Sequence, residues 1–140
     1  MVYFPDNYFE KEIRNGFEVS SMMKRAWAGQ IEVLSVIREI CERHNILWFA
    51  DYGTLLGAVR HKGFIPWDDD MDIRMTRDNL NNFIKYAKDE LPDEYKLLCM
   101  DLEPQYDSLI VRVVNSTSVS MDKELSLIHI SEPTRLRRIS

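Results

Sequence analysis

One short segment constrains the fold more than any other. Residues 68–75 read Asp-Asp-Asp-Met-Asp-Ile-Arg-Met, an acidic start followed by strict alternation of apolar and polar residues. Because successive side chains of a strand point to opposite faces, this pattern predicts a strand with one buried face. Asp70 and Asp72 then share the other face, about 6.6 Å apart at Cα. Their carboxylates can converge on one divalent cation, so the segment predicts a metal site.

A glycine-hydroxyl turn precedes this strand. Residues 52–57 read Tyr-Gly-Thr-Leu-Leu-Gly. Gly53 permits a close backbone approach that a Cβ would block, and Thr54 offers a hydroxyl and an N–H group to a phosphate. We expect a short helix after this turn, with its free N–H groups directed at the turn. A phosphate-binding turn beside metal carboxylates predicts phosphoryl transfer.

The loop between the turn and the strand concentrates hydrogen-bond donors. It carries Arg60, His61 and Lys62 in succession, and a guanidinium suits bidentate contact with phosphate. Arg60 either contacts substrate or pairs with the acidic cluster, and His61 is either a catalyst or a surface group. The predicted roles are metal ligands (Asp68, Asp70, Asp72), substrate-binding residues (Gly53, Thr54, Arg60, Lys62) and catalytic residues (Asp70, Asp72, Arg60, His61).

Other well-known sites do not fit. Asp68, Asp70 and Asp72 match the first ligands of an EF-hand, but its sixth position is Ile73 in place of glycine and its twelfth is Asn79 in place of glutamate. The Walker A and dinucleotide-binding glycine patterns do not occur. Cys41 and Cys99 lack the spacing of a zinc site, and we expect both to be buried, reduced thiols.

Composition indicates one globular domain. The chain has 140 residues, 45% of them hydrophobic, and a formal charge of −5 that argues against binding of nucleic acid. No stretch has the roughly 18–20 apolar residues of a membrane span, and the first residues do not form a signal peptide. These features predict a cytoplasmic protein whose partners are small anionic molecules held through a metal.

Periodicity predicts an α/β (α+β) fold, a mixed sheet packed with helices. Residues 1–18 are expected to form an irregular arm, and residues 19–124 the domain. The expected elements of that domain are helices over 21–44, after residue 54, and over 77–91, with strands over 46–50, 70–75, 95–100 and 109–114.

The last sixteen residues have a different origin in our interpretation. Residues 125–140 read Leu-Ser-Leu-Ile-His-Ile-Ser-Glu-Pro-Thr-Arg-Leu-Arg-Arg-Ile-Ser, which matches the in-frame translation of a transposase sequencing adapter. Segments of this kind are set aside in fold reasoning. We therefore expect the natural sequence of the fragment to stop near Glu124. The alternative is a short strand followed by a basic tail.

Residues 51–73, from Asp51 through Tyr-Gly-Thr-Leu-Leu-Gly to Asp-Asp-Asp-Met-Asp-Ile, resemble the signature of the LicD family, which is related to the fukutin-type transferases. The resemblance extends over about residues 15–120. It implies a nucleotidyltransferase-like fold in which Gly53 and Thr54 form the small-residue turn and Asp70 and Asp72 are the paired metal carboxylates.

The resemblance also implies an activity. Proteins of this family transfer phosphocholine from CDP-choline to cell-surface glycans such as lipopolysaccharide or teichoic acid, and relatives transfer other phospho-alcohols. For this chain it implies a transferase that uses Mg²⁺ or Mn²⁺, a CDP-linked donor and a glycan acceptor, at the inner face of the membrane. Two alternatives remain open: a nucleotidyltransferase that adds a nucleoside monophosphate to a small acceptor, and a non-catalytic binding domain.

One departure from the family pattern concerns the C-terminal part. Family members typically carry a later strand, Ile-Asp-Ile-Phe, whose aspartate resembles a third metal carboxylate, and nothing like it follows Val114. The strand expected at residues 110–114 resembles the family strand that comes directly before the Ile-Asp-Ile-Phe strand. We therefore expect an N-terminal fragment with an incomplete site and no activity of its own.

Overall fold

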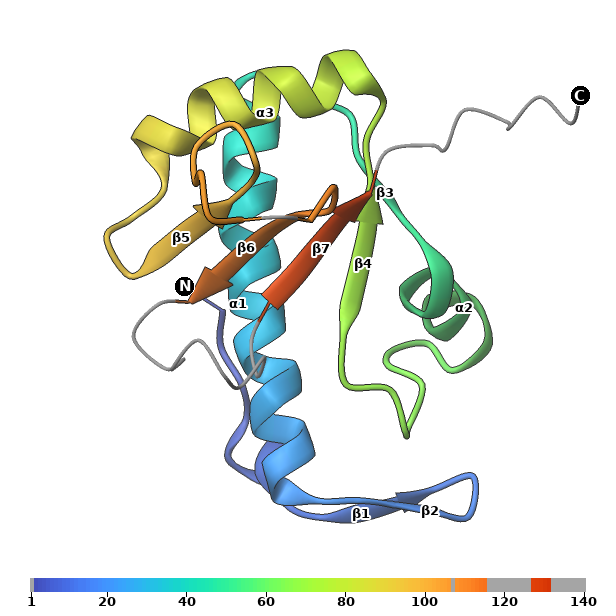
Figure 1. Cartoon of the computed structure of the whole chain (residues 1–140). Helices are drawn as coiled ribbons and strands as arrows, with labels where there is room; N and C mark the ends of the chain where they lie inside the picture. The colour runs from blue at the N-terminus through green and yellow to red at the C-terminus, as the bar shows by residue number, and fades with distance from the viewer. Residues whose placement is uncertain (1, 107, 116–126, 132–140) are drawn as a thin grey trace, which may run out of the picture.

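The computed structural model describes residues 2–106 and 108–115, and the backbone of residues 127–131. Three α-helices, one 3-10 helix and seven strands form these parts of the chain (Figure 1). In chain order the elements are η1 (Asp6–Phe9), β1 (Glu12–Arg14), β2 (Phe17–Val19), α1 (Ser21–Arg43), β3 (Phe49–Ala50), α2 (Tyr52–Arg60), β4 (Met71–Arg74), α3 (Arg77–Glu90), β5 (Tyr95–Leu98), β6 (Val111–Asn115) and β7 (Leu127–Ser131).

The main sheet has five strands in the order β3-β4-β7-β6-β5. The β4–β7 pair is parallel and the other three pairs are antiparallel, so the sheet is mixed. Figure 1 shows α1 running behind β6 and β7, α3 crossing near one end of α1, and α2 lying beyond β4. This architecture confirms the predicted α+β class.

The core lies between the sheet and the pair α1 and α3. The buried face of β4 consists of Met71 and Ile73, continued by Met75, while Asp72 and Arg74 are only half-buried. This confirms the alternation predicted from the sequence. The apolar residues of β4 pack in one cluster with residues such as Ile37 on α1 and Phe83 on α3. The polar face of β4 is thereby fixed opposite the core.

Side-chain caps start both long helices. The hydroxyl of Ser20 accepts a hydrogen bond from the Met23 N–H group at 3.1 Å, and α1 begins at Ser21, the residue at which the helix was expected to begin. The Thr76 hydroxyl accepts one from the Asn79 N–H group at 3.4 Å and starts α3. Asn45, just after α1, has a φ of 53°, the left-handed conformation that commonly follows a helix end.

The strand expected at residues 46–50 is shorter than predicted and comprises only β3. The Ile46 N–H group donates to the Cys41 carbonyl at 2.8 Å, and the Leu47 N–H group donates to Asn79 Oδ1 at 3.0 Å. Both donors are thus used at the ends of α1 and α3. Strand β3 therefore begins only at Phe49.

The N-terminal arm is more regular than expected. It contains η1 and a hairpin in which Ile13 pairs with Glu18, and this hairpin lies at the foot of α1 in Figure 1. The turn of the hairpin is Asn15-Gly16, with φ values of 50° and 75°. Asn-Gly is the dipeptide that favours such a two-residue turn, so the irregular arm predicted from the sequence is corrected here.

Strand β7 occupies the middle of the sheet, between β4 and β6. In the register, Asp72 is the partner of His129, and His129 is also the partner of Arg112 on β6. All residues of β7 belong to the segment 125–140, which the adapter interpretation assigns to a non-native tail. Their origin stays a prediction, but strand pairing at this position of the sheet is a property of the chain as it stands.

Two further expectations concern the chain as a whole. Cys41 and Cys99 are both buried free thiols, as predicted, and burial together with the nearby Glu42 raises the pKa of Cys41 to about 12. Among the helices of the described residues, none is both long and apolar enough to cross a membrane.

Candidate functional site

Three consecutive carboxylates meet just before β4. One oxygen from each of Asp68, Asp69 and Asp70 lies within 4.8 Å of the others. Asp69 was not predicted as a ligand, and it joins the group because the loop turns before the strand pattern begins. Asp72, predicted as a ligand, lies outside this group on β4 itself. Its N–H group donates to Thr54 Oγ1 at 2.8 Å.

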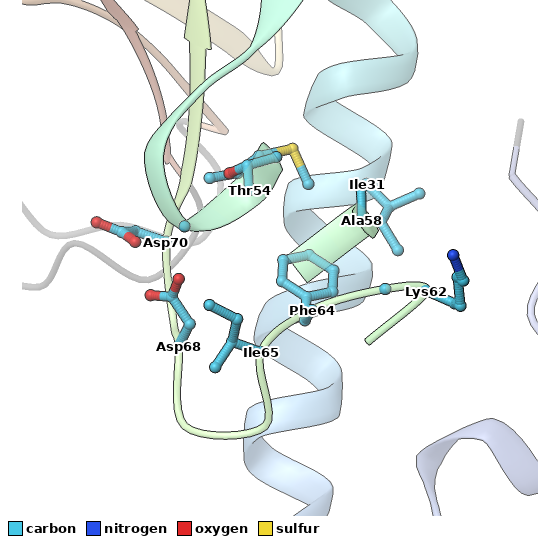
Figure 2. A pocket seen from close by; sticks show the side chains of 11 residues that line it. Ile31, Thr54, Ala58, Lys62, Phe64, Ile65, Asp68 and Asp70 are labelled. Atoms are coloured by element: carbon cyan, nitrogen blue, oxygen red, sulfur yellow. The ribbon is translucent and has the colours of Figure 1, made fainter. Parts of the chain in front are cut away.

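A cavity of about 440 Å³ lies next to the carboxylates, a size suited to a small ligand. Figure 2 shows the Asp68 and Asp70 side chains at one end of it and Lys62 at the other. Gly53 and Thr54 also line the cavity, so the structure brings five predicted site residues to one space. The apolar part of the wall comes from α1, α2, the loop before β4 and the first residue of β4, and consists of Ile31, Ala58, Phe64, Ile65 and Met71.

Gly53 has a steric role in the structure itself. A Cβ at this position would lie 2.3 Å from Asp68 Oδ2. The missing side chain therefore makes room for the Asp68 carboxylate against the first turn of α2, and the contact with phosphate stays a prediction. Thr54, the next residue, holds the start of β4 through its hydroxyl. The turn and the acidic loop thus fit each other directly.

Gly57 of α2 packs against the loop that follows the helix. A Cβ there would lie 2.5 Å from the Gly63 carbonyl oxygen. The Gly57 carbonyl in turn accepts hydrogen bonds from the N–H groups of His61, at 2.8 Å, and Gly63, at 3.3 Å. The loop can pack onto α2 only because residue 57 has no side chain.

Two α1 side chains contact the acidic loop, and sequence reasoning missed this role. Trp27 Nε1 donates to the Asp68 carbonyl at 2.8 Å, and Gln30 Nε2 donates to the Asp69 carbonyl. The Trp27 ring also stacks on Phe64, with centroids 4.8 Å apart. The available signal was a glutamine at helical spacing between the apolar residues Trp27 and Leu34.

Arg60 and His61 do not line the cavity. Arg60 is exposed at the end of α2, and His61 Nδ1 accepts a hydrogen bond from Asn15 Nδ2 at 3.0 Å. His61 therefore contacts the N-terminal hairpin. Lys62, which has a φ of 57°, does line the cavity, and its Nζ donates to the Val59 carbonyl at 3.1 Å.

An ion pair fixes the start of α2 to β4. Arg74 Nε and Nη2 each lie 2.8 Å from Asp51 Oδ2, and the Arg74 guanidinium lies 5.7 Å from the centroid of the Tyr52 ring. The Asp51 N–H group also donates to the Asp72 carbonyl at 3.0 Å. These contacts hold the Gly53-Thr54 turn in register with the acidic loop.

The donor set suits a hard divalent cation. Mg²⁺ and Mn²⁺ prefer carboxylate oxygens, and Asp68, Asp69 and Asp70 bring three of them together. Close like charges repel, and a bound cation relieves that repulsion. The residues present therefore fit the predicted ion.

The fold and the site define an α+β domain with a carboxylate site beside a Gly-Thr helix start. The family model described as LicD/FKTN/FKRP, nucleotidyltransferase domain, matches residues 45–132. This match covers more than half of the chain, so the chain belongs to the LicD family.

Individual relatives agree with this assignment. The chain is 37% identical over 84 residues to the lipopolysaccharide cholinephosphotransferase LicD of Haemophilus influenzae. The aligned region covers 59% of this chain and 32% of that protein. It is 40% identical over 52 residues to an uncharacterised protein of Rickettsia typhi, 37% of this chain and 17% of that protein. A third relative, an uncharacterised protein of Rickettsia prowazekii, is 48% identical over 42 residues, 30% of this chain and 16% of that protein. The matches thus span a third or less of these relatives.

Proposed function

We propose that the family-length protein is a phosphotransferase that moves phosphocholine, or a similar phospho-alcohol, from a CDP-linked donor to a cell-surface glycan. The observation that carries this proposal is the group of three carboxylates, two of which, Asp68 and Asp70, line one cavity together with Thr54. The relative from Haemophilus influenzae, named as a lipopolysaccharide cholinephosphotransferase, supports the choice of phosphocholine and of lipopolysaccharide. Teichoic acid is the second acceptor that fits the same chemistry.

The reaction is a single exchange at phosphorus. An acceptor hydroxyl oxygen forms a bond to the phosphorus that carries choline, and the bond from that phosphorus to the bridging oxygen of the diphosphate breaks. CMP leaves with the electron pair, and the hydroxyl proton passes to a base that none of the predicted residues supplies. The residues must therefore mainly position the donor and neutralise its charge.

Asp68, Asp69 and Asp70 would hold Mg²⁺ or Mn²⁺, with Asp72 as the further ligand predicted from the strand. When bound, the ion supplies charge neutralisation at the phosphate oxygens. Thr54 lies at the same end of the cavity and orients the donor there. Lys62, at the other end, contacts a more distant part of the donor, and Arg60 and His61 are left with outer positions.

We place this activity in the cytoplasm, at the inner face of the membrane, where a CDP-linked donor and a lipid-anchored glycan meet. The 140-residue chain itself is expected to lack turnover. In its sheet the register partner of Asp72 is His129, which is not a carboxylate, whereas the family resemblance implies a third metal carboxylate on a strand after Val114.

The test is a transfer assay on the family-length protein. CDP-choline, Mn²⁺ and lipopolysaccharide are incubated and followed by ³¹P NMR, and CMP together with phosphocholine on the glycan are the expected products. Asp70→Asn should reduce the rate at least 100-fold, in line with removal of a group that stabilises charge in the transition state. Asp93→Asn, on an exposed turn, is the matched control. Absence of CMP release would contradict the proposal.

The description of the family as a nucleotidyltransferase domain favours one second candidate, transfer of a nucleoside monophosphate to a small acceptor. The same assay with nucleoside triphosphates separates the two, because this reaction releases pyrophosphate in place of CMP. A non-catalytic binding domain, for which His129 beside Asp72 is the supporting observation, would bind donor and release neither.

A further inference from the structure

We infer that Trp27 and Gln30 of α1 are positioning residues, which set the geometry of the three carboxylates without contacting the substrate. This inference rests on the proposed function, because it assigns the carboxylates to a cation. The two residues are three positions apart on α1 and so project from the same face of the helix. They reach two successive carbonyl groups of the loop, those of Asp68 and Asp69.

Burial shows that these contacts are not incidental surface bonds. Trp27 and Gln30 are each 1% exposed. An amide buried to this degree is costly unless its polar atoms are bonded, and an apolar side chain would pack at the same position without that cost. Gln30 Oε1 has no hydrogen-bond partner among the described residues, so the bond from Nε2 to Asp69 is what uses the amide.

The two bonds hold the backbone where it matters for the carboxylates. Fixing the carbonyls of Asp68 and Asp69 fixes the planes of the peptides that join Asp68, Asp69 and Asp70. On the other side, the space over Gly53 is matched to Asp68 Oδ2. The loop is therefore held from α1 by hydrogen bonds and from α2 by close contact.

The consequence is preorganisation of the site. Three carboxylates within 4.8 Å repel one another before a cation binds, and a loop free to move would separate them. The bonds from α1 oppose this separation, so the cation does not have to gather its ligands. Loss of either bond should weaken cation binding by about five- to tenfold, the usual range for one buried hydrogen bond.

The experiment uses the 140-residue chain and Mn²⁺ as the probe. Gln30→Met removes the amide at similar volume, and Trp27→Phe removes the Nε1 donor but keeps a ring against Phe64. Val33→Ala, a fully buried core position on the same helix, is the control for lost stability without lost loop contacts. Mn²⁺ affinity is measured by electron paramagnetic resonance, and amide hydrogen exchange is followed at Asp69 and Asp70.

Weaker Mn²⁺ binding and faster exchange at these amides in both loop variants, with near-unchanged values in Val33→Ala, are the expected results. The inference is overturned if the loop variants keep both values, or if Val33→Ala changes them as much. If the unmodified chain binds no Mn²⁺, the assignment of the three carboxylates to a cation site in this chain fails, and exchange alone then decides whether α1 positions the loop. Trp27→Phe keeps the test available if Gln30→Met does not fold.

Discussion

Gly57 on α2 lies close to Gly63 in the loop that leads to the acidic residues. Only Gly57 has no room for a side chain. A Cβ on Gly57 would lie 2.5 Å from a backbone oxygen, whereas a Cβ on Gly63 would meet nothing within 4 Å. At an exposed helix position, Gly→Ala raises the free energy of unfolding by up to about 1 kcal/mol. At Gly57 the clash with the backbone oxygen outweighs this gain. We expect Gly57→Ala to lower the free energy of unfolding by about 1–3 kcal/mol.

Urea denaturation of the two variants measures this difference. Gly63→Ala is the matched control and should stay within about 0.5 kcal/mol of the unmodified chain. Equal stabilities for the two variants would show that the loop does not pack on α2 as the structure has it.

Lys62 and His61 are adjacent in sequence but contact different parts of the molecule. Lys62 lines the cavity, and His61 bonds to Asn15 of the hairpin. If the cavity holds the donor, Lys62→Gln should weaken binding of CDP-choline with Mn²⁺ about five- to tenfold, because a charged hydrogen bond is lost. His61→Ala should change it less than about twofold on the same reasoning.

Isothermal titration of CDP-choline in the presence of Mn²⁺ gives both values. A large loss in His61→Ala with little effect of Lys62→Gln would contradict this assignment and would favour the predicted role of the histidine at the site.

The sequence predicted most of the side chains that lie together at the site, and the roles assigned to them stay predictions. Gly53, Thr54, Asp68 and Asp70 were all predicted as site residues, because the glycine-hydroxyl turn and the acidic strand start are each visible as local patterns within residues 51–73. The contact between Gln30 and Asp69 joins residues 39 positions apart, and no local pattern reports such a bond.

At the element scale, Glu90 links the ends of α1 and α3. Its carboxylate contacts His44 Nε2 at 2.6 Å and Arg43 Nη1, and the His44 ring stacks on Tyr86. Desolvation raises the pKa of Glu90, but hydrogen bonds and charges from His44 and Arg43 outweigh it and hold the pKa below its usual value.

This depressed pKa fixes the direction of a pH effect. The link contributes stability above the ordinary glutamate pKa and loses it as pH falls through the lower folded-state pKa. Glu90→Gln should therefore be less stable than the unmodified chain at pH 7, and the difference should shrink as pH falls below about 4.

Urea unfolding at a series of pH values checks this. Glu42→Gln, at an exposed ion pair with Arg38, is the control and should show little effect at any pH. A constant difference between Glu90→Gln and the unmodified chain down to the acid limit would contradict the assignment.

Elements with strong local signals were predicted well. The caps Ser20 and Thr76 and the alternation after Asp70 determine where α1, α3 and β4 lie. Strand β3 was overestimated because two of its expected donors bond elsewhere. The hairpin was missed although Asn15-Gly16 predicts one, since strands of three residues are too short for their alternation to be distinctive.

At the scale of the whole molecule, α2 presents an apolar face. Tyr52, Leu55, Leu56 and Val59 are exposed and lie at helical spacing on one side of it. An exposed cluster of this kind favours association, so we expect the 140-residue chain to self-associate as its concentration rises.

Sedimentation velocity over a range of concentrations measures this, with Val59→Lys as the variant that breaks the apolar face. Val59 is 65% exposed, so the substitution should reduce association and leave folding intact. A chain that stays monomeric up to the highest concentration, with or without the substitution, would rule out this role of α2.

The order of the strands in the main sheet was not predicted from the sequence. Local patterns predict strands, but the position of β7 between β4 and β6 is set by long-range pairing. Whether residues 125–140 are native stays a prediction, which sequencing of unfragmented DNA across the codons for Met121 to Ser140 would decide.

The central claim is that Asp68, Asp69 and Asp70 form a cation site, and Mn²⁺ titration of the 140-residue chain beside its Asp70→Asn variant tests it most directly. The expected results are one bound ion, at least tenfold weaker binding in Asp70→Asn, and unchanged binding in Asp93→Asn. A chain that binds no Mn²⁺, or an Asp70→Asn variant that binds it as well as the unmodified chain, would contradict the claim.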